Sequence, residues 1–236
     1  MDKVKLPDFR NVEEAEKYNR LATMGWVTDV WPTVMIPINN MRYSYWKGMI
    51  GEVNGLRVFD LGCGYGLLSE TFARDGANVV GMDASEGLIN VARERAREQG
   101  LGISYHVGYA EQLNLDGQFD VVVAADVLEH VRDLEQTVKR SSAMVAKGGY
   151  YCFLTNNKTP KAKYAIITLP EEILQVMPKG YHNFDQFITP ETITELLKSN
   201  GIVVKEIKGV DIEVETTTFR LSEDPSAMYI GYGVKE

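Results

Sequence analysis

The segment Asp60-Leu-Gly-Cys-Gly-Tyr-Gly66 constrains the fold more than any other part of this sequence. It ends a short apolar run that begins at Leu56 and is typical of a buried parallel strand. A helical pattern follows as far as Arg74. Glycines at such a strand-to-helix turn let the backbone approach a ligand without a side-chain clash. The segment therefore predicts an α/β domain with a ligand site at this turn.

The rest of the chain continues the alternation of strand and helix. Further strands are predicted at 78–83, 103–108, 119–126 and 149–155, separated by helices at 66–74, 87–99 and 134–145. Such alternation implies a parallel sheet covered on both faces. The last two strands, 202–210 and 227–234, have no helix between them and are expected to pair antiparallel at one edge. We therefore predict a mixed, Rossmann-like sheet of seven strands with an antiparallel last strand.

Two regions lie outside this alternation. Residues 1–50 are expected to form an N-terminal helical cap, with helices at 12–22, where Asn11 is the expected N-cap, and 39–50. Residues 157–188 form a long, proline-broken insertion, and such insertions are usually functional, often as lids. A helix is expected from Pro190, with Thr189 as its N-cap. All 236 residues are expected to form one domain.

Composition excludes several classes of protein. The formal net charge of −8 argues against nucleic acid as a general partner. Cys63 and Cys152 are far apart in the sequence and lack metal-ligand spacing, so a reducing, cytoplasmic location without a disulfide framework is expected. The N-terminus has no apolar signal-peptide core. No stretch approaches the roughly 20 apolar residues of a membrane span.

The spacing of the glycines favours S-adenosylmethionine (SAM) over a dinucleotide. Dinucleotide folds use G-x-G-x-x-G, whereas here Gly66 comes one residue early after Gly62 and Gly64. SAM has no pyrophosphate to cradle. It requires close backbone approach to its amino-acid part and a carboxylate for its ammonium group, and Asp60 opens the segment. The alternative is a generic glycine-rich turn.

Residues after the next two strands extend this cofactor site. Asp83 ends the second strand, where a carboxylate can accept hydrogen bonds from both ribose hydroxyls. That feature does not separate SAM from NAD, because both contain ribose. Ala110 and Glu111 follow the third strand and are placed to border the adenine. An ordinary loop is the alternative for these two residues.

The fourth strand ends in Ala125-Asp-Val-Leu-Glu-His130, which carries a candidate metal site. Asp126, Glu129 and His130 would share one face if this segment formed a helical turn. Two carboxylates and an imidazole could then hold a divalent cation, and the oxygen-rich set suits Mg²⁺. The alternative is that Glu129 only braces the loop.

With these motifs in place, the chain resembles the ubiquinone-biosynthesis O-methyltransferases over nearly all of its length. The glycine segment, Asp83 and Leu128–Val131 are shared with many methyltransferases. More specific are Ile38-Asn-Asn-Met-Arg42, Met177-Pro-Lys-Gly-Tyr-His182, Phe187-Ile-x-Pro190 and Thr218-Phe-Arg-Leu221. The resemblance implies a class I SAM-dependent methyltransferase that methylates a phenolic hydroxyl of a catechol-like small molecule.

The resemblance also implies roles for individual residues. Arg42 would contact the cofactor at its carboxylate, and Ala125 would contact it through the backbone. Asp126, Glu129 and His130 would occupy the family's metal positions. Mg²⁺ there would bind both catechol oxygens and favour the phenolate. Without the metal, His130 or His182 would have to take the phenolic proton, because a free phenol has a pKa of about 10.

The insertion has two interpretations under this resemblance. In family members the segment before Met177 helps to engage membranes, which would permit peripheral membrane contact. Here Pro170, Glu171 and Glu172 break and acidify the segment, so a lid over the substrate pocket is favoured. Two other functions remain open: an N- or C-methyltransferase without metal, and a nucleotide-binding module without catalysis.

Overall fold

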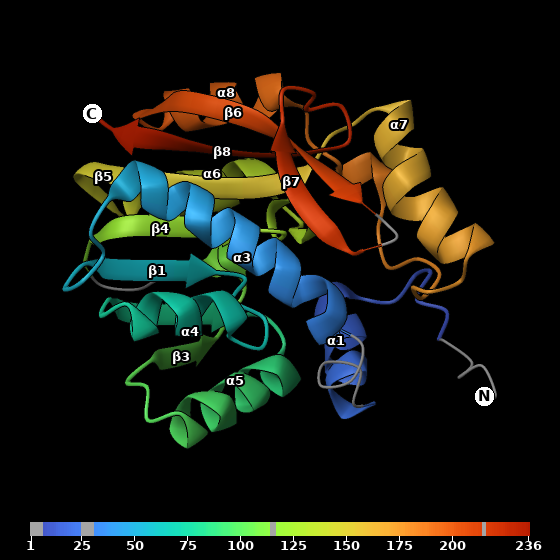
Figure 1. Cartoon of the computed structure of the whole chain (residues 1–236), viewed down its shortest axis with the longest axis horizontal. Helices are drawn as coiled ribbons and strands as arrows, with labels where there is room; N and C mark the ends of the chain where they lie inside the picture. Colours follow the sequence, from blue (N-terminus) through green and yellow to red (C-terminus); the bar gives the residue numbers. More distant parts are fainter. Residues whose placement is uncertain (1–6, 25–30, 114–116, 214–215) are drawn as a thin grey trace.

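A computed structural model of the chain describes residues 7–24, 31–113, 117–213 and 216–236 (Figure 1). A mixed sheet of eight strands crosses the molecule in the order β3-β2-β1-β4-β5-β8-β6-β7. Strands β1 to β5 are parallel, and β8 is antiparallel to both of its neighbours, β5 and β6. The strands are β1 (Arg57–Leu61), β2 (Asn78–Asp83), β3 (Ser104–Val107), β4 (Phe119–Ala125), β5 (Val145–Asn156), β6 (Ile202–Glu213), β7 (Thr218–Ser222) and β8 (Met228–Lys235).

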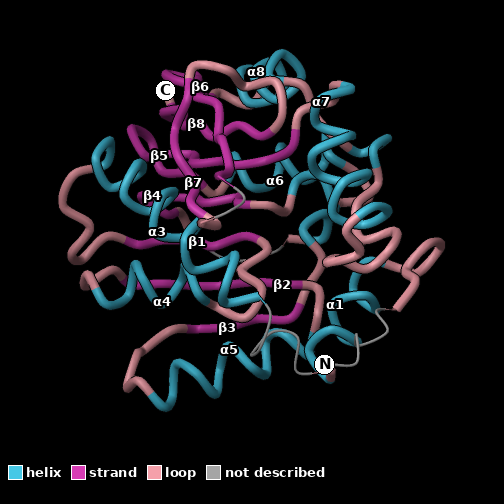
Figure 2. The backbone as a smooth tube through the Cα atoms, turned by 45° about the vertical axis from the view of Figure 1, so that its right-hand side comes forward, coloured by secondary structure: helices cyan, strands magenta, loops and turns pink. Residues whose placement is uncertain are grey.

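Helices cover both faces of the sheet (Figures 1 and 2). Contacts place α3 and α4 together on one face, and α6 and α8 together on the other. The longer helices are α1 (Glu14–Thr23), α3 (Trp31–Ile50), α4 (Leu67–Arg74), α5 (Glu86–Glu98), α6 (Leu134–Ala143) and α8 (Pro190–Ser199). Short turns are the 3₁₀ helices η1 (Ala110–Gln112), η2 (Leu128–His130) and η4 (Phe184–Gln186).

Alternate residues of the central strands build two separate cores. Val121 and Val123 of β4 pack under α3 and α4, whereas Val122 packs under α6 and α8. This is the period-two alternation of a strand buried on both faces. The parallel strands therefore end at the same edge of a rigid sheet, and the loops that leave this edge are held firmly.

The predicted Rossmann-like architecture is confirmed, with one more strand than expected. The additional strand is β7, which pairs antiparallel with the distal half of β6, Gly209–Glu213. The sequence prediction ended the preceding strand at Val210, so no partner for a further strand was expected. The predicted antiparallel pair is confirmed as β6 and β8.

The N-terminal cap differs from the prediction in detail. The N-cap of α1 is Glu13 rather than Asn11, which has a positive φ of 64°. Helix α3 begins at Trp31 and contains Pro37, although a proline removes a backbone donor. Packing compensates, because Trp46 is fully buried and its indole donates a 3.1 Å hydrogen bond to Gly231 of β8.

The insertion at 157–188 contains a short helix, α7 (Pro160–Ala162), that continues into a π-helix, η3 (Lys163–Ile173). The N-terminal cap contacts it directly, since the backbone N–H of Phe9 donates to the carbonyl of Lys179 at 2.7 Å. Phe9 and Leu21 of the cap also pack with Met177 and Tyr181. Cap and insertion thus form one joint cover at the end of the sheet.

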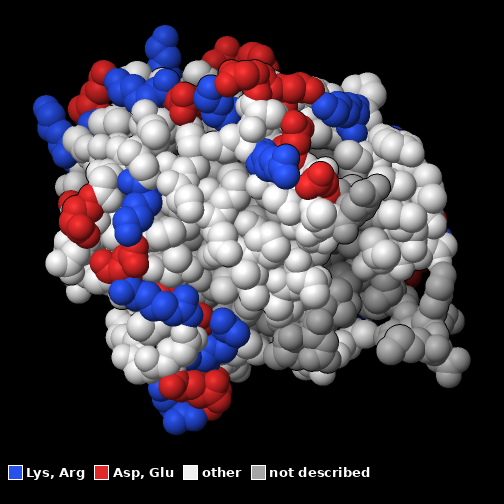
Figure 3. All heavy atoms as spheres, viewed as in Figure 1, with Lys and Arg blue, Asp and Glu red and all other residues white. Residues whose placement is uncertain are grey.

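Charged side chains of both signs lie mainly along the edges of the visible face, and the middle of that face is largely uncharged (Figure 3). Lys and Arg lie beside Asp and Glu on this face rather than in a continuous basic area. This agrees with the acidic net charge of −8. The face gives no support for binding a phosphate backbone.

Candidate active site

A cavity of about 860 Å³ lies at the carboxyl ends of β1, β2 and β4. The glycine loop forms one wall, and α1, α3 and the insertion form the other. Ligands of open α/β sheets bind at this edge, where the helices and loops leave the strands. The cavity therefore joins the predicted cofactor residues to the cap and the insertion.

The glycine loop is held open by backbone contacts. The N–H groups of Gly62 and Cys63 both donate to the carbonyl of Met82, at 2.8 and 3.0 Å. Gly62, Gly64 and Gly66 all have positive φ, a conformation that side chains disfavour. A Cβ at Gly62 would overlap Val127, and one at Gly66 would overlap Tyr105, whereas Gly64 faces open space. The loop thus exposes its backbone to the cavity at Gly64.

Asp83 connects this loop to the end of β2. Its carboxylate accepts hydrogen bonds from the backbone N–H groups of Gly64, at 3.0 Å, and Ser85, at 2.8 Å. Burial raises the pKa of Asp83, and these two hydrogen bonds oppose that shift. Because Asp83 also lines the cavity, its carboxylate is fixed at the cavity wall.

Of the other predicted cofactor residues, some line the cavity and one lies beneath it. Ala110, Glu111 and Ala125 line the cavity. Asp60 lies beneath the loop, 2% exposed, and accepts a 2.6 Å hydrogen bond from Ser69. Burial raises the pKa of Asp60 to about 6. Asp60 is therefore a buried support of the loop, and its carboxylate is not part of the cavity wall.

Arg42 and Asp126 form an ion pair across the cavity wall. Nη1 of Arg42, on α3, lies 2.9 Å from Oδ2 of Asp126, and both residues line the cavity. The Arg42 side chain is 6% exposed and that of Asp126 is 27% exposed. Asp126 has a positive φ of 54°, which for a residue other than glycine is an uncommon conformation that clusters at functional sites.

The predicted Mg²⁺ site is not assembled in this arrangement. Asp126 lies before the 3₁₀ turn η2 and outside any helical turn, so it does not share a helix face with Glu129 and His130. Asp126 pairs with Arg42, and both oxygens of Glu129 accept hydrogen bonds, from Thr155 at 2.8 Å and Asn156 at 2.9 Å.

The two carboxylates of the predicted set are therefore already paired within the protein. Among residues 7–24, 31–113, 117–213 and 216–236, no three His, Cys, Asp or Glu side chains are grouped to hold a metal ion. Burial raises the pKa of Glu129 to about 7. The residues do not fit the metal that the sequence suggested.

His130 has an acidic neighbour from the N-terminal cap. Its Nδ1 lies 3.5 Å from Oε2 of Glu14, an ion-pair distance without the geometry of a good hydrogen bond. Burial disfavours the charged ring, but the carboxylates of Glu14 and Glu129 outweigh it and raise the pKa of His130. The edges of the Tyr18 and Tyr181 rings also contact His130.

His182 comes from the insertion and has a different environment. Its Nδ1 lies 3.0 Å from Oε1 of Glu171, and its ring centroid is 5.8 Å from that of His130. Burial lowers the pKa of His182, and the contact with Glu171 only partly offsets this effect. Both histidines predicted as candidate bases therefore line the same cavity.

Sequence reasoning missed the acidic partners of these histidines. The sequence predicts Glu14 only as part of a cap helix and Glu171 only as an acid within the insertion. The available signal was a pair of acids, Glu171 and Glu172, directly after Pro170 in an otherwise apolar segment, which is unusual if the segment packs against the domain. His106, in contrast, lies on an exposed position of β3.

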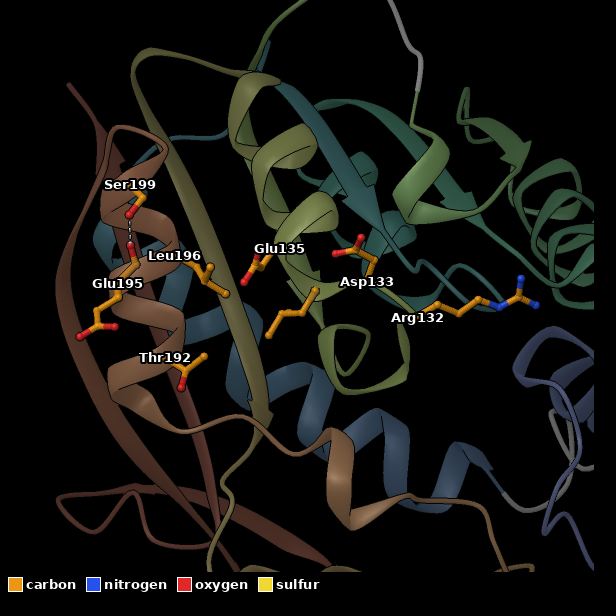
Figure 4. Close-up of a pocket in the computed structure, with 8 residues that line it drawn as sticks. Arg132, Asp133, Glu135, Thr192, Glu195, Leu196 and Ser199 are labelled. Carbon is orange, nitrogen blue, oxygen red and sulfur yellow. Dashed lines mark hydrogen bonds between the residues drawn. The ribbon is translucent and has the colours of Figure 1, made fainter.

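A second hollow, of about 610 Å³, lies between α6 and α8 (Figure 4). Glu135 of α6 and Glu195 of α8 line it, and Arg132 at its edge points away and pairs with Glu13 at 2.5 Å. This hollow contains neither the glycine loop nor a histidine. It therefore has no part in the site described above.

Comparison with known proteins identifies methyltransferases as relatives of this chain. Residues 59–153 match the family described as "Methyltransferase domain". The chain is 36% identical over 227 residues to the ubiquinone biosynthesis O-methyltransferase of Coxiella burnetii (strain CbuK_Q154), covering 95% of this chain and 97% of that protein. It is 32% identical over 224 residues to the protein of that name from Bordetella avium (strain 197N), covering 93% of each.

Solved structures show the same fold. Magnesium protoporphyrin IX methyltransferase from Synechocystis PCC 6803, solved with bound S-adenosylhomocysteine (SAH), superposes with a TM-score of 0.66 at 21% identity, over 97% of each chain. A SAM-dependent methyltransferase from Thermotoga maritima gives 0.68 at 17% identity, over 95% of this chain and all of that one. In the part of the chain that the structure describes, no helix combines the length and apolar character that would carry it across a bilayer.

Proposed function

Because this chain belongs to the ubiquinone-biosynthesis O-methyltransferase family and is a SAM-dependent methyltransferase, we propose that it methylates a phenolic hydroxyl of a small aromatic acceptor. The observation that carries this proposal is that one cavity contains both the glycine loop and two histidine rings. A methyl acceptor with an acidic O–H requires a base beside the cofactor, and this cavity supplies one.

The cofactor would lie against the glycine loop. Gly64 exposes backbone there, and Asp83 is placed to accept hydrogen bonds from the ribose hydroxyls. SAM supplies an electrophilic methyl group on a positively charged sulfur. Arg42 is placed to attract the cofactor carboxylate, in competition with its pairing to Asp126. These residues fix the methyl group so that orientation contributes much of the rate.

The acceptor would lie between the loop and the insertion. The insertion contributes apolar wall residues Ala165, Ile166, Leu169 and Met177, which suit an aromatic ring. A phenol with a pKa of about 10 is mostly protonated at neutral pH. His182 takes this proton as the acceptor oxygen attacks the methyl carbon, and the electron pair of the carbon–sulfur bond remains on sulfur.

His182 is better suited than His130 to accept a proton at neutral pH. The burial that lowers its pKa keeps the His182 ring neutral and able to accept a proton, whereas the acids around His130 favour the charged ring. Mg²⁺ at Asp126, Glu129 and His130 is the competing route. Chelation separates the two: a rate unchanged by EDTA supports the histidine, and a rate lost to EDTA and restored by Mg²⁺ would overturn it.

The direct experiment uses purified protein, methyl-labelled SAM and a 4-alkylcatechol. We expect SAH and a mono-O-methylated catechol, identified by mass spectrometry. Transfer to amines or ring carbon but not to oxygen would show an N- or C-methyltransferase. A thermal shift with SAH but no transfer to any acceptor would favour a binding module. Either result would refute the proposed O-methyl transfer.

A further inference from the structure

Glu171 is a buried acid within the insertion. Among the residues of η3, all of which are described, it alone is buried, with 2% of its surface exposed. Burying a carboxylate is costly unless hydrogen bonds replace the lost water. An acid at this position in an apolar helix therefore indicates a specific set of partners.

Three donors satisfy this carboxylate. Oε2 accepts the backbone N–H of Gly180 at 2.8 Å, and Oε1 accepts the backbone N–H of His182 at 3.0 Å. Oε1 also lies 3.0 Å from Nδ1 of His182. An ionised carboxylate is an acceptor only, so the proton between these two side chains belongs to Nδ1. The contact therefore selects one tautomer of the imidazole.

That tautomer leaves Nε2 with a lone pair. The described residues provide His182 with a side-chain hydrogen bond at Nδ1 and with none at Nε2. The ring lines the cavity that contains the glycine loop, and its side chain is 11% exposed. A neutral imidazole whose unprotonated nitrogen is available in a substrate cavity has the form required of a general base.

We infer that Glu171 is a positioning residue that holds His182 as the Nδ1–H tautomer, so that Nε2 accepts the acceptor's hydroxyl proton. This inference rests on the proposed O-methyl transfer. As the new carbon–oxygen bond forms and the carbon–sulfur bond breaks, the proton moves to Nε2 and the ring becomes imidazolium. The anionic carboxylate on Nδ1 stabilises that positive charge and remains ionised throughout.

His130 provides the internal contrast. Its acidic neighbour, Glu14, lies 3.5 Å away, and neither Glu14 Oε2 nor His130 Nδ1 has a hydrogen-bond partner among the described residues. Glu171 instead combines the side-chain contact with two backbone hydrogen bonds on the same loop. The ring of His182 is thus fixed in orientation, which a base needs and which His130 lacks.

The test compares Glu171→Gln with Glu172→Gln, an exposed neighbour that undergoes the same change of charge. We expect E171Q to lower kcat by at least about 10- to 100-fold, the loss seen when an outer-shell partner of a metal-ligating histidine is removed. SAH affinity should not change. Glu171→Asp retains the negative charge and should recover part of the rate. Equal kcat in E171Q and E172Q would refute the inference.

Two further readouts separate positioning from a loss of folding. In His182→Ala/Glu171→Gln, kcat should equal that of H182A alone, because Glu171 acts through His182; additive losses would contradict this. Nitrogen-15 NMR of the imidazoles requires no turnover, and the chain has three histidines to assign. Wild type should show His182 protonated on Nδ1, and E171Q should not. A wild-type Nε2–H tautomer would overturn the inference, whereas a wild type that methylates no oxygen would overturn the proposed function alone.

Discussion

The two walls of the cavity are built in different ways. The cofactor wall is held by hydrogen bonds between neighbouring strand ends, such as those from Gly62 to Met82 and from Gly64 to Asp83. The acceptor wall is held by side chains from distant parts of the chain, such as Glu14 beside His130 and Phe9 against Met177. The sheet fixes the first wall, and packing of the cap against the insertion fixes the second.

This difference predicts a division of labour. Changes in the cofactor wall should alter affinity for SAM and SAH with little effect on the chemical step. Changes in the acceptor wall should alter kcat and leave cofactor affinity intact. A variant that changes cofactor affinity and kcat equally would show that the two walls are coupled and would contradict this prediction.

The largest expected effect is that of His182→Ala. Removing a general base lowers the rate by about 10²- to 10⁴-fold, so kcat should fall within this range while SAH affinity, measured by calorimetry, stays unchanged. His106→Ala is the matched control, because His106 is exposed on β3. A wild-type kcat in H182A would show that His182 is not the base and that His130 or a bound metal takes over this role.

The next effect concerns Asp60, a buried acid beneath the cofactor wall. The folded-state pKa of Asp60 is about 6, against an ordinary value of 3.8. A carboxyl whose pKa is raised by folding destabilises the protein once it ionises. That cost is absent below about pH 4 and is complete above about pH 6. Asp60→Asn should therefore gain stability over wild type as pH rises through this window, by on the order of 3 kcal/mol.

Urea denaturation at pH 4 and pH 7 measures this difference. A stability difference between D60N and wild type that stays constant with pH would show that Asp60 is not a strained buried charge. SAH affinity of D60N supplies a second result, because the Asp60 carboxylate lies outside the cavity wall. A small loss of affinity would agree with a supporting role beneath the loop.

The two walls also differ in how far the sequence predicts them. Glycine spacing and the Asp83 position follow from patterns within one strand-turn-helix unit, so the cofactor wall was predicted residue by residue. Glu171 and Glu14 meet their histidines only through tertiary packing, which no local pattern encodes. The predicted metal set is not assembled for the same reason: Asp126 adopts a positive φ and pairs with Arg42, which lies 84 residues away in the sequence.

A third variant tests the cofactor wall directly. Asp83→Asn keeps the shape but removes the charge that accepts hydrogen bonds at the end of β2. Hydrogen bonds to a charged group contribute about 1.5–3 kcal/mol, so SAH should bind about 10- to 100-fold more weakly. At saturating SAM, kcat should be near wild type. Glu86→Gln, an exposed acid three residues later, is the control and should bind SAH normally.

The smallest effect tests whether Glu129 belongs to the scaffold rather than to the chemistry. Thr155→Val keeps the shape of β5 but removes the 2.8 Å hydrogen bond to Glu129. Glu129 then keeps Asn156 as its one remaining side-chain donor. Losing the other hydrogen bond should lower the free energy of unfolding by about 1–2 kcal/mol. This corresponds to a drop of several degrees in Tm for a chain of this size.

In the same variant SAH affinity should be unchanged, and kcat should fall no more than a few-fold, because Glu129 transfers no proton in the proposed reaction. A loss of kcat as large as that of H182A, with Tm unchanged, would place Glu129 in the chemistry and reopen the metal site.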